Sequence, residues 1–221
     1  MVSYKSIIVL ICSLLFASVI NSQNKKIMIE QNNKYYIEAE RFKKELARDE
    51  ADYKLIFYHK GKINEDDVHI FRFEPQSSKE LTLKGPHVTV ILDNNNKLKG
   101  FARLNEEMAG KAKTDEKEGI RQSLLFLNKY APDLKDSRYQ WTKSHQERVK
   151  DSTGKLISIN GSWVKYQDKD SGEYLWVILA PDNSIMEFDR DIVWSFFKGG
   201  RVNELWLRDD WFEKWLKKNN K

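Results

Sequence analysis

The sequence has few of the residues on which several classes of protein depend. Its 221 residues include one cysteine, four prolines and ten glycines. A disulfide-rich scaffold needs more cysteine, and a collagen-like chain needs far more glycine. A disordered chain would be poorer in aromatic side chains than the 12% found here. The composition therefore indicates a chain that builds a hydrophobic core, in one domain or in two small ones.

The sequence also lacks a strong net charge. It has 38 Lys and Arg against 33 Asp and Glu, which gives a formal net charge of +5. The two signs are interleaved along both halves, whereas a nucleic-acid-binding face needs clustered Lys and Arg. We therefore expect no nucleic-acid partner, and we expect the charges to support solubility.

A long apolar run is found at the N-terminus, where 14 residues from Ile7 to Ile20 follow Lys5. A basic residue, an apolar run and then small and polar residues are the layout of a secretory signal peptide. A spanning helix needs about 20 apolar residues, so retention as an anchor is the weaker alternative. We predict that residues 1–22 are a signal peptide and that no stable membrane span remains after cleavage. The mature chain is then secreted, periplasmic or part of the cell envelope.

The single cysteine, Cys12, lies within this apolar run. Lipidation of Cys12 is a minor alternative, because the residue before a lipidated cysteine is normally small and Ile11 is not. If the segment is removed, the mature chain has no disulfide, no thiolate nucleophile and no cysteine metal site, although its compartment is oxidising. Its core must hold the fold alone.

One segment recurs at a spacing of 87 residues. Residues 90–103 align with residues 177–190, and six of the 14 positions are identical. Each copy predicts a buried strand, a tight turn that contains asparagine, and a second strand. The alignment places Phe101 over Phe188. We therefore predict two equivalent hairpins in which these two rings occupy equivalent core positions.

Further elements are expected before each hairpin. In the first copy, an apolar stripe at helical spacing predicts a helix at about residues 34–49, and strand-like runs follow at 53–59 and 68–73. In the second copy, Thr114 can cap a helix that Pro132 ends. Strands are then expected near residues 138–149, 155–159 and 162–167. The dipeptide Asn160-Gly161 predicts a hairpin turn between the last two.

These elements predict an α+β fold of two tandem modules. Each module is expected to be an amphipathic helix packed on a small antiparallel sheet. The first module covers residues 23–109. The second covers residues 110–221 and includes a C-terminal aromatic helix. The polar stretch at residues 104–113 is expected to link them.

The second copy resembles the PepSY type of extracytoplasmic module. The residues that carry the resemblance are Thr114 to Tyr130 in the helix, Tyr139 and Trp141 in the next strand, and Tyr174 to Phe188 in the closing hairpin. The chain departs from the pattern at Gly119, where alanine is common, and at Asn96 and Asn183, where such modules have glycine.

The PepSY resemblance implies a secreted or envelope-facing binding module with a protein or peptide partner. Related modules occur in the propeptides of thermolysin-like metalloproteases, where they chaperone or inhibit the protease. The resemblance therefore suggests a modulator of a protease or of another extracytoplasmic protein.

The sequence predicts no catalytic residue, no metal site and no cofactor. Its four histidines show none of the HxH, HxxxH or HExxH spacings of metal sites, and no GxSxG motif is present. The adjacent acids Glu65, Asp66 and Asp67 do not follow the alternating ligand pattern of a calcium loop. His69 lies in a strand-like run and is expected to be a packed or edge residue instead of a metal ligand. We expect a protein that is not an enzyme, and a hydrolase with a spatially assembled site is the least favoured alternative.

The C-terminus is rich in aromatic residues, and all seven tryptophans follow residue 140. Asp209 can cap a final helix at about residues 210–219, whose aromatic face is expected to pack on the sheet of the second module. Alternatively, exposed aromatic side chains form a pocket for a small molecule or a glycan. The candidate ligand-binding residues are Trp194, Arg201, Trp206 and Trp211. A closed cavity lined by Trp194 and Trp206 would favour such a ligand, whereas a flat or edge-strand surface would favour a protein partner.

Overall fold

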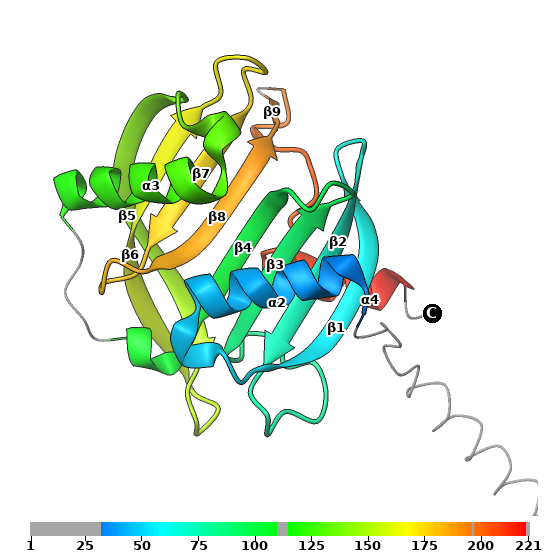
Figure 1. The fold of residues 1–221 in the computed structure, drawn as a ribbon. Coiled ribbons are helices and arrows are strands. Elements are labelled where there is room, and N and C mark those ends of the chain that lie inside the picture. Colours follow the sequence, from blue (N-terminus) through cyan, green and yellow to red (C-terminus); the bar gives the residue numbers. More distant parts are fainter. Residues whose placement is uncertain (1–31, 110–114, 196, 220–221) are drawn as a thin grey trace, which may run out of the picture. The chain divides into compact units, whose positions relative to one another are not determined.

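The computed structural model describes residues 32–109, 115–195 and 197–219. The predicted signal peptide and Thr114 lie outside these residues. In the described part of the chain, eight strands form one antiparallel sheet in the order β1-β2-β3-β4-β8-β7-β6-β5 (Figure 1). The strands are β1 (Lys54–Ile63), β2 (Asp66–Glu74), β3 (His87–Asp93), β4 (Leu98–Leu104), β5 (Arg138–Lys150), β6 (Leu156–Gln167), β7 (Tyr174–Leu179) and β8 (Ile185–Ile192).

Helices and a small hairpin accompany the sheet. The α-helices are α2 (Lys34–Leu46), α3 (Glu116–Tyr130) and α4 (Asp209–Asn219), and short 3-10 turns lie at Arg48–Glu50, Glu106–Met108 and Pro132–Leu134. Strands β9 (Trp194–Ser195) and β10 (Gly200–Arg201) pair with each other. The predicted elements therefore exist for the most part, but their assembly differs from the prediction.

The prediction of two modules with separate small sheets is wrong. The last strands of the two halves, β4 and β8, pair with each other, and Phe101 lies opposite Phe188. The sheet therefore continues from one half into the other. Separate sheets would leave the edges of β4 and β8 with unpaired backbone groups, and joining them removes both edges.

Helices α2 and α3 lie on the same face of this sheet (Figure 1). Helix α2 contacts β2 and β3, and α3 contacts β5, β6 and β7. In α3, the Phe126 ring lies 4.9 Å from the ring of Phe188. The N-cap of α3 is Asp115, whose side chain accepts the Glu118 amide, so the prediction of Thr114 as the cap is wrong. An aspartate at this position also suits the positive end of the helix dipole.

The predicted hairpin turn at Asn160-Gly161 is also wrong. Both residues lie inside β6, which is continuous and pairs with β5 on one side and β7 on the other. A Cβ atom on Gly161 would lie 2.5 Å from the carbonyl oxygen of Leu179. Glycine is therefore required here for close approach of two backbones, and not for a turn.

The two predicted asparagine turns are confirmed. Asn96 and Asn183 have φ angles of 64° and 68°, in the left-handed region that asparagine tolerates better than most residues. In both turns the backbone N–H of the asparagine donates to the backbone carbonyl three residues earlier, which belongs to Asp93 in the first turn and to Ala180 in the second. The two hairpins, β3–β4 and β7–β8, thus close in the same way.

The C-terminal segment covers the sheet face opposite α2. Phe212 of α4 lies 4.9 Å from the ring of Phe57 in β1. Trp206, Leu207 and Phe212 share one core cluster with Ile63, Val68, Ile70, Ile91 and Ala102, all from β1 to β4. The expectation that the final helix packs on the second half is therefore wrong. A different core cluster includes Trp176 and Ile178 of the second half together with Leu104 and Met108, which precede residue 110.

Candidate functional site: an aromatic cavity at the free edge of the sheet

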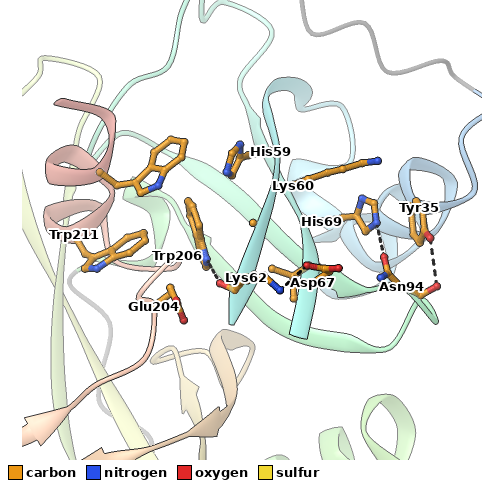
Figure 2. A pocket seen from close by; sticks show the side chains of 13 residues that line it. Tyr35, His59, Lys60, Lys62, Asp67, His69, Asn94, Glu204, Trp206 and Trp211 are labelled. Carbon is orange, nitrogen blue, oxygen red and sulfur yellow. Dashed lines mark hydrogen bonds and ion pairs between the residues drawn. The ribbon is translucent and has the colours of Figure 1, made fainter. Parts of the chain in front are cut away.

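A cavity of about 740 Å3 lies beside β1, which is the outermost strand at one end of the sheet. Figure 2 shows Trp206 and Trp211 on one side of the strands and Tyr35, His69 and Asn94 on the other. The cavity is lined by Tyr35, His59, Lys60, Gly61, Lys62, Asp67, Val68, His69, Asn94, Glu204, Trp206, Trp211 and Trp215. It therefore combines side chains from α2, the first two strands, the β3–β4 turn and the C-terminal segment.

One wall of the cavity is aromatic. The ring of Trp206 lies 4.8 Å from that of Trp211 and 5.0 Å from that of Trp215. His59 of β1 completes the group, with its ring 4.5 Å from that of Trp215. A Cβ atom on Gly61 would come within 2.7 Å of the Trp206 ring, so only glycine lets the indole lie this close to β1. These rings give the cavity a broad apolar surface of the kind that binds aromatic and aliphatic groups.

The opposite wall is a hydrogen-bonded stack. The Tyr35 ring stacks on His69 at 3.6 Å. The Nε2 atom of His69 lies 3.1 Å from Asn94 Oδ1, and its Nδ1 atom lies 2.9 Å from the Tyr58 hydroxyl. Because Asn94 Oδ1 can only accept, Nε2–H is the donor, and Nδ1 accepts from Tyr58. Burial lowers the pKa of His69, which favours this neutral form. The prediction that His69 is a packed residue is confirmed.

Among the residues that the structure describes, no strand pairs with the outer backbone edge of β1 at the cavity. Ile63 pairs with Asp66 across a two-residue turn, and the pairing continues without a shift as far as Tyr58. Because hydrogen-bonded and non-hydrogen-bonded pairs alternate in such a hairpin, Tyr58, Lys60 and Lys62 direct their N–H and C=O groups away from β2. The carbonyl oxygen of Lys62 accepts a 2.8 Å hydrogen bond from Trp206 Nε1. Along the same edge, the outward backbone groups that follow the Lys62 carbonyl are those of Lys60 and then Tyr58.

The charges in the cavity are unevenly paired. Lys62 Nζ lies 3.0 Å from Asp67, which raises the pKa of this lysine. Glu204 accepts the backbone amide of Asn64 at 3.0 Å. Lys60 is exposed, and within residues 32–109, 115–195 and 197–219 it forms no ion pair with a carboxylate. Of the four charged side chains that line the cavity, Lys60 and Glu204 therefore have no ion-pair partner among the described residues.

Only two of the four predicted ligand-binding residues line this cavity, namely Trp206 and Trp211. Arg201 instead forms an ion pair with the buried Asp189 and donates to Asn203 Oδ1 at 2.7 Å. Trp194 is 41% exposed in β9 and is not among the lining residues. The expected cavity lined by both Trp194 and Trp206 is therefore not this one, and sequence reasoning missed the contributions of His59 and Lys60.

The described residues were also compared with the requirements of a metal site and of a membrane-spanning helix. Among the described residues, no group of three or more His, Cys, Asp or Glu side chains is placed to hold a metal ion. In the same part of the chain, no helix combines the length and the apolar character that crossing a membrane requires.

Comparisons with known proteins do not assign the chain to a family. No protein-family model matches it, and neither a curated protein nor a solved structure gives a match. The resemblance to PepSY modules therefore stays a prediction.

Proposed function

We propose that this protein is a secreted, non-enzymatic binding protein that takes up an extended segment of another protein along β1. The observation that carries the proposal is the free backbone edge of β1 beside an aromatic cavity. Addition of a strand to an exposed sheet edge is a common mode of peptide recognition, in which backbone hydrogen bonds give affinity and side-chain pockets give specificity. The resemblance to PepSY modules supports an extracytoplasmic partner, and a protease is one class of partner that it suggests.

A proline at position 60 tests the proposal. The Lys60 amide points away from β2, so Lys60→Pro removes a donor for an added strand without removing a bond of the native sheet. Lys60→Thr removes the same side chain but keeps the amide, and it is the matched control. We expect wild type to capture a partner from the secreted and envelope fractions of the source cells, Lys60→Thr to capture the same partner less tightly, and Lys60→Pro to lose it.

The fold of each bait is checked by its thermal unfolding midpoint. Equal capture of the same partner by a folded Lys60→Pro bait would exclude recognition through the edge of β1. Loss of capture in both variants would assign recognition to the lysine side chain instead of to the backbone.

A second candidate function is the binding of a small molecule or glycan in the same cavity. It is favoured by the contact of Trp206, Trp211 and Trp215, because aromatic rings form apolar platforms for such ligands. A ligand of this kind does not need the backbone edge. Its binding would be unchanged in Lys60→Pro and lost in Trp215→Ala, and titrations that follow tryptophan fluorescence distinguish the two functions.

A further inference from the structure

The two sides of the β1 edge present different chemistry to an added strand. This inference rests on the proposed function, because it concerns the kind of segment that binds there. Side chains of a strand alternate between the two faces of a sheet. A segment that pairs with the backbone of Tyr58 and Lys60 therefore directs successive side chains first to one wall of the cavity and then to the other.

The face that carries His59 and Gly61 is apolar. The missing side chain of Gly61 faces the Trp206 ring, and His59 lies on the same face because it is two residues away. Trp215 extends this wall beside His59. A side chain of the added strand that points to this face meets indole and imidazole rings, so an aromatic or large aliphatic residue is preferred here.

The other face carries Lys60 and Lys62. Lys60 has no carboxylate partner among the described residues, and Lys62 and Asp67 are both more than half exposed in their ion pair. The second acid of the cavity, Glu204, accepts the Asn64 amide and lies beside Trp206, on the other side of the strands from Tyr35 and His69 (Figure 2). Residues of an added strand that point to this face lie beside two lysines, so acidic residues are preferred on either side of the apolar one.

A second copy of this chain does not fit the same edge. Strand β1 contains Lys54, Lys60 and Lys62 and no acidic residue, so pairing of two β1 edges would bring lysines together. Strand β5, at the other end of the sheet in the described part of the chain, contains Arg138, Lys143, Arg148 and Lys150 against one acid, Glu147. Like charges directly opposite one another destabilise a pair of strands, and edge lysines are a common protection against self-association.

We propose that the edge of β1 recognises an extended acidic segment in which an aromatic or large aliphatic residue stands between two acidic residues. The Trp206 indole N–H already donates a hydrogen bond to the carbonyl oxygen of Lys62, so the added strand ends at that position. The recognised segment is therefore short. Because directly opposed residues point to the same face, its apolar residue lies opposite Gly61 and its two acidic residues lie opposite Lys60 and Lys62.

A pair of synthetic peptides tests this proposal with the full chain. The probe is acetyl-Ser-Thr-Glu-Phe-Glu-Thr-Ser-amide, and its control has lysine in place of both glutamates. Binding is measured by tryptophan fluorescence and by calorimetry, because three tryptophans line the cavity. We expect the acidic peptide to bind wild type about tenfold more tightly at low salt, with a smaller difference at high salt. We expect Lys60→Glu to reverse the preference, and Lys60→Pro to weaken binding of the acidic peptide.

The outcomes separate this inference from the proposed function. If the acidic and lysine peptides bind equally and Lys60→Pro weakens both, the preference for acidic segments is wrong and binding along the edge stands. If Lys60→Glu keeps the preference for the acidic peptide, recognition does not pass through Lys60 and the inference is overturned. The absence of saturable binding of the acidic peptide up to about 1 mM would also overturn it.

Discussion

At the scale of single residues, His87 is neutral at pH 7 and is almost completely buried. Its Nδ1 atom lies 2.8 Å from the carbonyl oxygen of Gly85, so Nδ1–H is the donor. Burial, together with the nearby Arg72 guanidinium, lowers the pKa of His87 to about 4. In the unfolded chain its ordinary value is 6.5. The folded state therefore takes up this proton at much lower pH than the unfolded state.

This difference predicts a loss of stability in mild acid. As the pH falls from 7 to 4.5, the unfolded chain binds a proton at His87 that the folded chain does not, so the free energy of unfolding decreases by about 2 to 3 kcal/mol from this residue. The contribution is fully present above pH 6.5. His87→Asn keeps a donor for Gly85 and does not titrate, so it should lose correspondingly less stability over this range. Urea denaturation at both pH values measures the difference, and parallel losses in both proteins would contradict it.

Single residues also show where the sequence predicts the site and where it does not. The crowding of tryptophans near the C-terminus is visible in the sequence, and two of the candidate ligand-binding residues, Trp206 and Trp211, line the same cavity. The role of Arg201 depends on Asp189, a buried residue of another strand whose position follows only from the sheet order. His59 and Lys60 belong to the site because β1 is an edge strand. No local sequence pattern predicts which strand of a sheet lies at its edge.

At the scale of elements, the hydrophobic periodicity predicts the helices and most strands, but it does not predict the partners of each element. Helices α2 and α3 begin and end within a few residues of the expected positions because their apolar stripes and caps are local signals. The dipeptide Asn160-Gly161 was misinterpreted because glycine serves both turns and close backbone contacts, and only the approach of Leu179 distinguishes them.

An arginine in β4 and an arginine in β8 form ion pairs with the 3-10 turns that follow α2 and α3. These arginines are Arg103 and Arg190, which the sequence alignment places over each other. Arg103 Nε donates to Glu50 at 2.7 Å, in the 3-10 turn after α2. Arg190 Nη2 donates to Asp133 at 2.6 Å, in the 3-10 turn after α3. The two ion pairs are equivalent in position, but Glu50 is almost completely buried and the Asp133 side chain is 37% exposed.

The difference in burial predicts different costs for the two arginines. Arg103→Met leaves the buried Glu50 carboxylate without its cation and should cost about 3 to 5 kcal/mol of unfolding free energy. Arg190→Met should cost about 1 kcal/mol, because water can solvate Asp133. Chemical denaturation measures both. The double variant Arg103→Met with Glu50→Met should recover part of the loss, and equal costs for the two single variants would show that burial of the partner does not decide them.

At the scale of the whole molecule, the halves are joined by a short strand pairing. The β4–β8 register includes three residue pairs, of which the central one is Phe101 with Phe188. Both rings are completely buried. The α4 segment also connects the halves, since it follows the second half in sequence and packs on the first. We infer that the described residues unfold as one cooperative unit.

Phe101 and Phe188, which lie opposite each other where β4 pairs with β8, predict a large loss of unfolding free energy when either ring is removed. Phe101→Ala and Phe188→Ala should each cost about 3 to 5 kcal/mol, because each removes a buried ring from the core. The double variant should cost less than the sum, since the two side chains are in direct cross-strand register. Circular dichroism and tryptophan fluorescence should report the same unfolding midpoint. A near-zero cost at either position would remove the case for an internal repeat, and two separated transitions would contradict a single cooperative unit.

The packing of α4 on the first strands has a consequence for how the protein is made. The hydrophobic face of β1 to β4 receives Trp206, Leu207 and Phe212, which are among the last residues of the described chain to be synthesised. Contacts between the two ends of a sequence form slowly, because a long loop must close before they contribute. A nascent chain therefore holds this face uncovered until residues 206–212 have been synthesised. Premature termination before residue 206 would release a product that exposes Ile70 and Ile91, a natural substrate for chaperones and quality-control proteases.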